Sequence, residues 1–312
     1  MPWLSHLLRR TPPTLAGLFA ITGAVFLLSL SDALVKRLSG GVSLGQVLLV
    51  RSCVAAVLLA VTLCVTKSAG VRGFSARPWV WARSCCLTLM WGCYYAALPV
   101  LPFSLAAACY YTAPIWMAVL SAGLFRHCIG WRGAGAIALG LSGMITILRP
   151  GPGDLSPVMV LPLLAGILYA VAAMITYGRC RGVAPVSLAL NLNLVLAAAG
   201  AALVVIRLVV DADDAGFHAS AWPPLEPSTW ALLAGLGGLL AVVATATALA
   251  YQLAPAPVVG LFDNGYLVFA LFWSAALFGE VPAVPDLAGV VLIGGGAVLA
   301  SLAPRRCRTG SG

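Results

Sequence analysis

Residues 253–280 read LAPAPVVGLFDNGYLVFALFWSAALFGE, a stretch in which Asp263 is the only charged side chain before Glu280. An α-helix needs about 20 mainly apolar residues to cross the hydrocarbon core of a bilayer, and this stretch supplies them. Nine further apolar segments, bounded by charged residues, Pro or Gly, occupy the rest of the chain. The ten predicted segments are 15–35, 43–65, 80–99, 102–125, 131–149, 157–177, 185–207, 229–251, 255–278 and 284–303.

The composition of the chain fits a protein that lies almost entirely within a membrane. Of its 312 residues, 62% are hydrophobic and only 9% are charged, and the mean hydropathy is +1.02. Soluble domains carry about 25% charged residues, so the composition excludes a water-soluble globular enzyme. Ten spans of about 20 residues use roughly 200 residues and leave no room for a separate soluble domain. We therefore expect an all-α membrane protein with ten transmembrane helices.

The basic residues predict how the chain is oriented. With the N-terminus in the cytoplasm, 12 of the 18 Lys and Arg residues flank the cytoplasmic ends of the segments and 4 flank the outer ends, while Arg51 and Arg83 lie within segments. Cytoplasmic loops of membrane proteins carry such an excess of basic residues. We expect a multi-pass protein of the inner cell membrane whose tails, 1–14 and 304–312, are both cytoplasmic. Nucleic-acid binding is not expected, because the net charge of +9 comes with no basic stripe and no RNA-binding motif.

The two halves of the chain resemble each other. Residues 121–143 read SAGLFRHCIGWRGAGAIALGLSG, and residues 274–296 read SAALFGEVPAVPDLAGVVLIGGG. A constant offset of 153 residues aligns these stretches and pairs Gly143 with Gly296. Each half holds five segments, and this odd number makes the second half enter the membrane in the opposite orientation. Inverted repeats of this kind recur in secondary transporters. We expect two inverted five-helix repeats, at 15–149 and 157–303.

Short motifs add to this pattern of repeats. They are DALVK at 32–36, Arg51, YTAP at 111–114, IGWRG at 129–133, LRPG at 148–151 and the run at 253–280. With these motifs the chain resembles, over almost its whole length, a ten-helix EamA-type member of the drug/metabolite transporter superfamily.

The resemblance implies a transporter that works by alternating access around a cavity at the membrane midplane. The expected substrate is a small polar metabolite that is amino-acid-like, nucleoside-like, a cofactor or an opine-type metallophore, and export is favoured over uptake. A carboxylate such as Asp263 can load and release a proton. The two alternatives are therefore transport coupled to a proton gradient and facilitated diffusion, which uses no energy source. The expected partners are the substrate, the lipid bilayer, protons and, in one arrangement, a second copy of the chain in a homodimer.

Two other classes of function are alternatives. A membrane-embedded lipid-modifying enzyme needs clustered acids or histidines, whereas the three histidines lie on separate segments. A channel or a membrane scaffold is the second alternative. We expect no catalysis, no cofactor and no metal site. The glycines at 294–296 lie in an apolar segment without GxGxxG or a Walker lysine, and the nine cysteines include no CxxC pair.

Asp263, followed by Asn264, is the sharpest candidate for a functional residue. It lies about eight residues into the ninth segment, away from both of its ends. A charged side chain at the centre of a bilayer costs roughly 2.5–3.5 kcal/mol on insertion, so it needs a partner or a function. Asp263 either binds a substrate amine or a proton in a central cavity, or it braces helix packing through hydrogen bonds.

Three other charged side chains lie within or near the segments. Arg51, about eight residues into the second segment, either binds a substrate carboxylate through its planar fork or pairs with an acid such as Asp32. Asp32 precedes Lys36 by one helical turn, as a gate or as an intrahelical ion pair. Arg83 lies one turn inside the third segment, and we expect its side chain to extend to the cytoplasmic interface.

Tyrosines occur as adjacent pairs at 94–95 and 110–111, in the outer halves of two neighbouring segments. They either form an aromatic wall that stacks a planar or cationic substrate or pack as ordinary core residues. Adjacent residues on a helix point about 100° apart, so at most one of each pair faces a cavity, and we assign Tyr95 and Tyr111. Secondary candidates for the same lining are Asn191, Asn193, Tyr169, Tyr177, Tyr251 and Gln252.

Overall fold

Every regular element in the described part of the chain is a helix, which confirms the all-α prediction. The computed structural model describes residues 12–38, 42–66, 78–97, 109–110, 112–125, 130–148, 157–210, 222, 224–279 and 283–301. Its elements are α2 (Pro13–Leu38), α3 (Leu44–Val65), α5 (Pro78–Ala97), α7 (Ala113–Phe125), α8 (Trp131–Leu148), a 3₁₀ turn η2 (Pro157–Met159), α9 (Val160–Arg179), α10 (Pro185–Val210), α11 (Pro227–Leu253), α12 (Ala256–Asp263), α13 (Gly265–Phe278) and α14 (Val284–Ser301).

The helix ends follow local sequence signals. Four of the α-helices begin at a proline, which fits the first turn because that turn needs no backbone N–H at this position. The start of α3 instead carries a capping box: Gln46 N donates to Ser43 Oγ, and Ser43 N donates to Gln46 Oε1, each at 3.2 Å. Both residues are buried, so the cap satisfies backbone groups that water does not reach.

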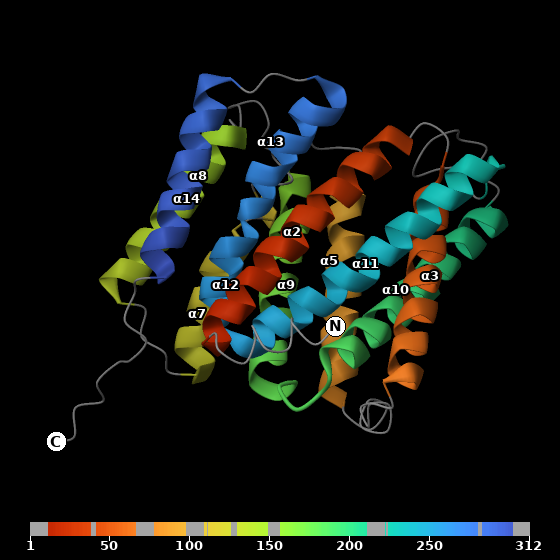
Figure 1. Cartoon of the computed structure of the whole chain (residues 1–312), viewed down its shortest axis with the longest axis horizontal. Helices are drawn as coiled ribbons and strands as arrows, with labels where there is room; N and C mark the ends of the chain where they lie inside the picture. The colour runs from red at the N-terminus through yellow and green to blue at the C-terminus, as the bar shows by residue number, and fades with distance from the viewer. Residues whose placement is uncertain are drawn as a thin grey trace.

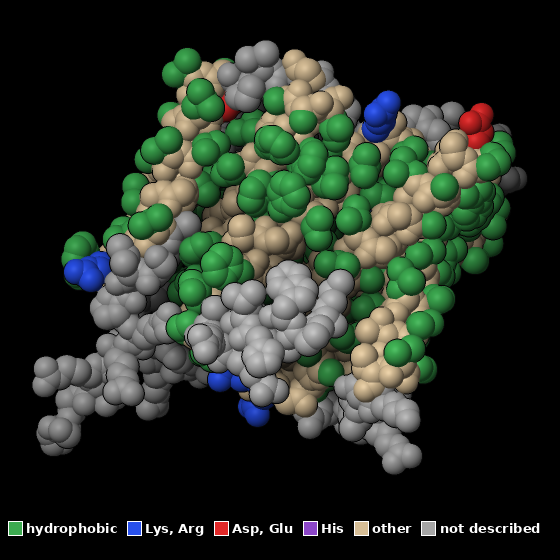
Figure 2. Space-filling model, viewed as in Figure 1, with side chains coloured by type: hydrophobic (Ala, Val, Ile, Leu, Met, Phe, Trp, Pro, Cys, Tyr) green, Lys and Arg blue, Asp and Glu red, His purple; other side chains and the backbone are tan. Residues whose placement is uncertain are grey.

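Six helical stretches are long and apolar enough to cross a membrane, and they indicate a multi-pass membrane protein. Figure 2 shows hydrophobic side chains over most of the visible face, with the Lys, Arg, Asp and Glu side chains near the ends of the helices. The count of ten spans and the orientation of the termini stay predictions. The six stretches are Pro13–Val35, Leu44–Val65, Pro157–Arg179, Pro185–Val209, Pro227–Leu253 and Ala256–Leu277.

The helices pack mainly in pairs drawn from the two halves of the chain. In Figure 1, α8 and α14 lie side by side at one edge of the molecule, and α3 and α10 lie at the opposite edge. Between these edges, α2 packs on α11 and α5 packs on α9, while α7 packs on α12 and α9. The central buried cluster therefore takes side chains from both halves of the chain.

Glycines bring α3 and α10 into close antiparallel contact. A Cβ on Gly45 would lie 2.8 Å from Cγ2 of Val204, and a Cβ on Gly200 would lie 2.8 Å from the backbone nitrogen of Leu49. Neither site has room for a larger side chain without a shift of its neighbour. Small residues allow such backbone approach between membrane helices, where van der Waals contact replaces the hydrophobic drive that lipid does not supply.

The same kind of contact joins α8 and α14. A Cβ on Gly143 would lie 2.5 Å from the carbonyl oxygen of Gly289, and a Cβ on Gly296 would lie 2.8 Å from the carbonyl oxygen of Ala136. In both cases the obstacle is backbone, which cannot rotate away as a flexible side chain would. The two helices are therefore held at a distance that only glycine permits at these positions.

The ninth predicted segment, 255–278, is divided into two helices. Residues Ala256–Asp263 form α12 and Gly265–Phe278 form α13, with Asn264 as a turn between them. The fourth predicted segment is also interrupted, because a turn at Thr112 separates the helical residues 109–110 from α7. At Asn264 the backbone hydrogen bonding continues, because Asn264 N donates to the Gly260 carbonyl at 3.3 Å and Leu267 N donates to the Asn264 carbonyl at 3.1 Å.

The three consecutive glycines of α14 allow a test of this packing. Gly296→Ala should destabilise the protein by about 1–3 kcal/mol, because the added methyl overlaps the backbone of α8. Gly294→Ala and Gly295→Ala are the controls, because a Cβ at either position meets nothing within 4 Å. Thermal unfolding of the purified protein in detergent measures the difference. Equal melting temperatures for all three variants would contradict the packing described here.

Candidate functional site

A cavity of about 590 Å³ lies among the central helices. Small-molecule sites in proteins usually measure 300–1,000 Å³, so this volume suits a metabolite-sized ligand. Its lining in the described residues is mostly apolar, with a few polar groups that converge on one space. The lining side chains come from α2, α3, α5, α9, α10, α11, α12 and α13, together with Tyr110.

Three charged side chains contribute to the described lining: Asp32 of α2, Arg83 of α5 and Asp263 of α12. Each comes from a different helix, and two of the three are acidic. The described residues contain no group of three His, Cys, Asp or Glu side chains that could hold a metal ion. The cavity therefore offers carboxylates and a guanidinium for direct contact with a solute.

Asp263 lies at the interruption of the ninth segment and contributes to the cavity wall. The Tyr169 hydroxyl of α9 lies near this carboxylate and acts on it electrostatically. Asn264, the next residue, is 1% exposed and lies outside the described lining. Its Nδ2 has no hydrogen-bond partner among the described residues and faces Gly140 of α8. Of this predicted pair, only Asp263 faces the cavity.

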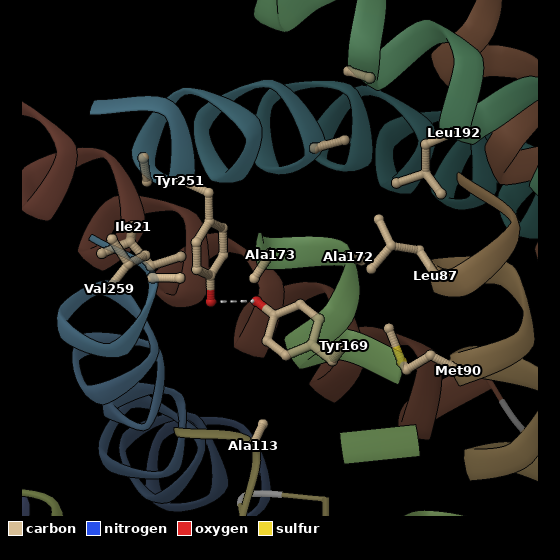
Figure 3. Packing of buried hydrophobic residues seen from close by; sticks show 14 of the residues in the cluster. Ile21, Leu87, Met90, Ala113, Tyr169, Ala172, Ala173, Leu192, Tyr251 and Val259 are labelled. Atoms are coloured by element: carbon tan, nitrogen blue, oxygen red, sulfur yellow. Dashed lines mark hydrogen bonds between the residues drawn. The ribbon is translucent and has the colours of Figure 1, made fainter. Parts of the chain in front are cut away.

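Four tyrosines form a continuous series along the cavity. The ring centroids of Tyr94 and Tyr110 are 5.5 Å apart, and those of Tyr110 and Tyr169 are 5.6 Å apart. Tyr251 completes the series, with its ring centroid 6.0 Å from that of Tyr169 and its hydroxyl donating to the Tyr169 hydroxyl at 3.2 Å (Figure 3). We call these four residues the tyrosine arc. It presents both ring faces and hydroxyl groups to a solute.

The tyrosines assigned from sequence are the neighbours of two members of the arc. Tyr95 lies in α5, but its side chain is outside the described structure, and Tyr111 is outside the described residues altogether. Tyr94 and Tyr110 line the cavity. The assignment of Tyr95 and Tyr111 stays a prediction. Which member of a pair faces a cavity depends on the rotation of the helix about its axis, which adjacent identical residues do not reveal.

Asp32 is held by a residue of the other half of the chain. The Tyr266 hydroxyl of α13 donates to Asp32 Oδ2 at 2.8 Å, and Arg51 acts on the carboxylate electrostatically. The expected partner Lys36 has its side chain outside the described structure. Arg51 itself is 2% exposed and outside the described cavity lining, and its Nε has no hydrogen-bond partner among the described residues.

Arg83 does not extend to the membrane interface, so that expectation was wrong. It is 3% exposed and points inward, where its Nε donates to Thr176 Oγ1 at 2.8 Å and its Nη1 donates to the Leu188 carbonyl at 3.4 Å. These two acceptors lie on α9 and α10, at 93 and 105 residues from Arg83 in the sequence. No local sequence signal pairs them, which is why sequence reasoning missed this functional candidate.

The secondary candidates divide into lining residues and structural residues. Tyr169 and Tyr251 line the cavity, whereas Asn191 and Asn193 are fully buried outside the described lining. Gln252, near the end of α11, binds the turn between α9 and α10: its Nε2 donates to the carbonyls of Cys180 at 2.7 Å and Val183 at 2.8 Å. The turn between α9 and α10 is thereby fastened to the end of α11. Tyr177 lies under the guanidinium of Arg181, with 4.0 Å from Cζ to the ring centroid.

Comparisons with known proteins show the fold alone. No family model matches the chain, and no curated protein matches it. The fold is similar to that of a solved crystal structure with a TM-score of 0.77 and 19% sequence identity, which covers 95% of this chain and 100% of the other. The arrangement of helices is thus one that an independently solved protein also adopts over almost its entire length.

The link between Asp32 and Tyr266 can be tested by a double-mutant cycle. A hydrogen bond to a charged group contributes about 1.5–3 kcal/mol, so Asp32→Asn and Tyr266→Phe should each lower the unfolding free energy. The double variant should lose less stability than the sum of the two single losses, because both changes weaken the same charge-assisted hydrogen bond: Phe removes its donor, and Asn leaves only a neutral acceptor. Thermal unfolding in detergent provides the measurement. Tyr266→Phe combined with Asp286→Asn, an acid of the first turn of α14, should be additive, and additivity in the main pair would refute the link.

Proposed function

We propose that the protein is a secondary transporter of a small polar metabolite and a member of the drug/metabolite transporter superfamily. The observation that carries this proposal is the position of Asp263 and the tyrosine arc on one metabolite-sized cavity within a bundle of apolar helices. In a membrane an ionisable group that faces a cavity marks a pathway for a solute or a proton. We assign Asp263 to binding a substrate cation or a proton.

Reciprocal glycine contacts support the proposed inverted repeats. Gly200 follows Gly45 by 155 residues, and Val204 follows Leu49 by the same number. If each residue is replaced by its counterpart in the other half, the contact of Gly45 with Val204 becomes the contact of Gly200 with Leu49. Both contacts are present, so the packing of α3 on α10 is unchanged by the exchange. This is the relation that a two-fold axis between two repeats produces.

The contact between α8 and α14 follows the same rule at the offset of 153 residues. This offset relates Gly143 to Gly296 and Ala136 to Gly289. Gly143 meets Gly289 and Gly296 meets Ala136, so this contact also reproduces itself on exchange of the halves. The packing of whole helices follows the same rule. In the proposed repeats α2 corresponds to α9 and α5 to α11, so the pair α2–α11 corresponds to the pair α9–α5, and both pairs are present.

The two helix interruptions support a site at the interface of the repeats. Tyr110 precedes Asp263 by 153 residues, and each lies beside an interruption: Tyr110 close before the turn at Thr112, and Asp263 directly before the turn at Asn264. Both side chains line the cavity. In secondary transporters of inverted-repeat architecture, interrupted helices at corresponding positions form the substrate site near the midplane. Alternating access would follow from rocking of one repeat against the other.

The proposal extends to the membrane, the direction and the energy source. We place ten spans, as two five-helix repeats, in the inner cell membrane with both termini in the cytoplasm, on the distribution of Lys and Arg residues. The substrate classes are those that the resemblance implies, with export favoured and protons as the coupling ion. No cofactor is required for this work. A lipid-modifying enzyme and a channel or scaffold are the rival functions that the transport assay tests.

The orientation predicts the behaviour of reporters fused to the two ends of the chain. Green fluorescent protein fluoresces when it stays in the cytoplasm and does not fluoresce when the general secretory route exports it. Alkaline phosphatase shows the opposite behaviour and is active only outside the cytoplasm. Fusions at residue 1 and at residue 312 should both fluoresce, and neither phosphatase fusion should be active. Termini on opposite faces would eliminate an even number of spans and, with it, the pair of inverted five-helix repeats.

The role of Asp263 can be tested in proteoliposomes. The substrate is first identified as the solute that accumulates inside cells lacking the protein and leaves when the protein is restored. Asp263→Asn should then slow counterflow of that labelled solute at least tenfold, because the variant loses a charge at the binding cavity. Glu226→Gln is the matched control, since Glu226 is exposed and its side chain makes no capping hydrogen bond.

Three results would count against the role of Asp263 or against the transporter. Folded Asp263→Asn that transports normally across a pH series would make Asp263 a structural residue. Non-saturable flux without counterflow would make the protein a channel, and turnover of an added lipid without vectorial movement would make it an enzyme.

A further inference from the structure

Arg83 is a buried cation without an acidic partner. It is 3% exposed, and none of the described carboxylates forms an ion pair with it. Its two hydrogen bonds go to neutral acceptors, the Thr176 hydroxyl and the Leu188 carbonyl. A charge in the interior of a membrane protein is expensive unless a partner compensates it. Among the described residues, the protein thus keeps a positive charge that no carboxylate pairs with directly.

The donors of Arg83 are only partly used. A guanidinium carries five N–H groups in a rigid planar fork, and two of them donate to the protein among the described residues. Arg83 also contributes to the cavity lining, so its side chain borders the space that a solute would occupy. Thr176 and Leu188 fix the orientation of the fork. The N–H groups of Arg83 are therefore held in a fixed orientation, and none of the described carboxylates accepts a hydrogen bond from them.

One face of α9 connects Arg83 to Asp263. Tyr169, Ala172, Ala173 and Thr176 all line the cavity, at spacings that place them on one side of the helix. Thr176 accepts a hydrogen bond from Arg83 at one end of this row, and Tyr169 lies near Asp263 at the other, about 10 Å away along the helix axis. Ala172 and Ala173 line the cavity together with Leu87 and Met90 of α5, so the described lining between the polar ends is apolar.

We propose that Arg83 is the anion-binding residue of the cavity and that it takes the carboxylate of a small substrate with an apolar or planar body. The body would lie on the alanine stretch of α9, between the guanidinium and the tyrosine arc. A carboxylate fits better than a phosphate dianion, because the described lining carries one cation and two acids, and a second negative charge would be repelled without compensation. This assignment rests on the proposed function and names the substrate class for it.

Arg51, the residue favoured from sequence for an anionic group, does not meet the same conditions. It is buried but lies outside the described lining of the cavity. A solute in the cavity therefore contacts Arg83 and not Arg51.

The experiment measures binding to the full-length protein in lipid nanodiscs. The probes are phenylpropionate, which carries a carboxylate on a planar body, and phenethylamine, which carries an amine on a similar body. Trp91 lines the cavity, so intrinsic fluorescence reports occupancy. Phenylpropionate should bind the native protein, and Arg83→Gln should weaken its binding at least tenfold, because a charge-assisted pair is lost. Arg83→Gln should not weaken phenethylamine binding.

Two further variants control for folding and for charge. Arg132→Gln removes an exposed arginine at the start of α8, outside the described lining, and should leave both affinities unchanged. Thr176→Val keeps the charge of Arg83 but removes the acceptor that orients it, so it should weaken phenylpropionate binding by a smaller factor. If Arg83→Gln fails to fold, Thr176→Val and Arg83→Lys decide the question.

The proposal is overturned if the native protein does not bind phenylpropionate or if folded Arg83→Gln binds it with native affinity. Without folded Arg83→Gln, native affinity in both Thr176→Val and Arg83→Lys overturns it. The assay requires no transport, so the two proposals can fail separately. Arginine-dependent binding without counterflow would retain the carboxylate site and reject the transporter. Counterflow of a solute with unchanged binding in Arg83→Gln would do the reverse.

Discussion

Polar groups within this bundle have to find their partners inside the protein, because the lipid around it offers none. The constraint explains the pattern of contacts between helices that are distant in sequence. The Tyr266 hydroxyl donates to Asp32, and the Tyr169 hydroxyl acts electrostatically on Asp263. Thr176 and a carbonyl of α10 satisfy part of Arg83. Each of these links joins helices that pack on each other beside the cavity, so the same side chains that hold the helices together also supply the few polar groups of its lining.

Close packing at the two edges of the bundle complements this polar centre. The pairs α3–α10 and α8–α14 meet at glycines whose replacement would overlap the facing helix. Both pairs join one half of the chain to the other, and neither contributes a charged group to the described cavity lining. The edges therefore join the two halves of the chain, while the charged groups of the described lining belong to the helices between them.

The sequence predicted the features that a single residue reveals and missed those that depend on a partner. An aspartate in an apolar run is conspicuous, and Asp263 was identified from that alone. The tyrosine pairs were found for the same reason, but the member that faces inward depends on helix rotation. Arg83 was misjudged because its distance from the segment end is typical of a side chain that reaches the interface. Its true environment is made by Thr176 and Leu188, far along the chain.

Gln252 links the end of α11 to the turn between α9 and α10 by hydrogen bonds that water could replace. Its amide donates to two carbonyls of the turn between α9 and α10, at 2.7 and 2.8 Å. Those carbonyls belong to a connection between helices, so separation of this end would expose them to water, which is itself a good donor. The enthalpy of the lost bonds would be recovered by hydration rather than stored as strain. The two hydrogen bonds of Gln252 would therefore hold while water is excluded and would be exchanged at little enthalpic cost if water reached them.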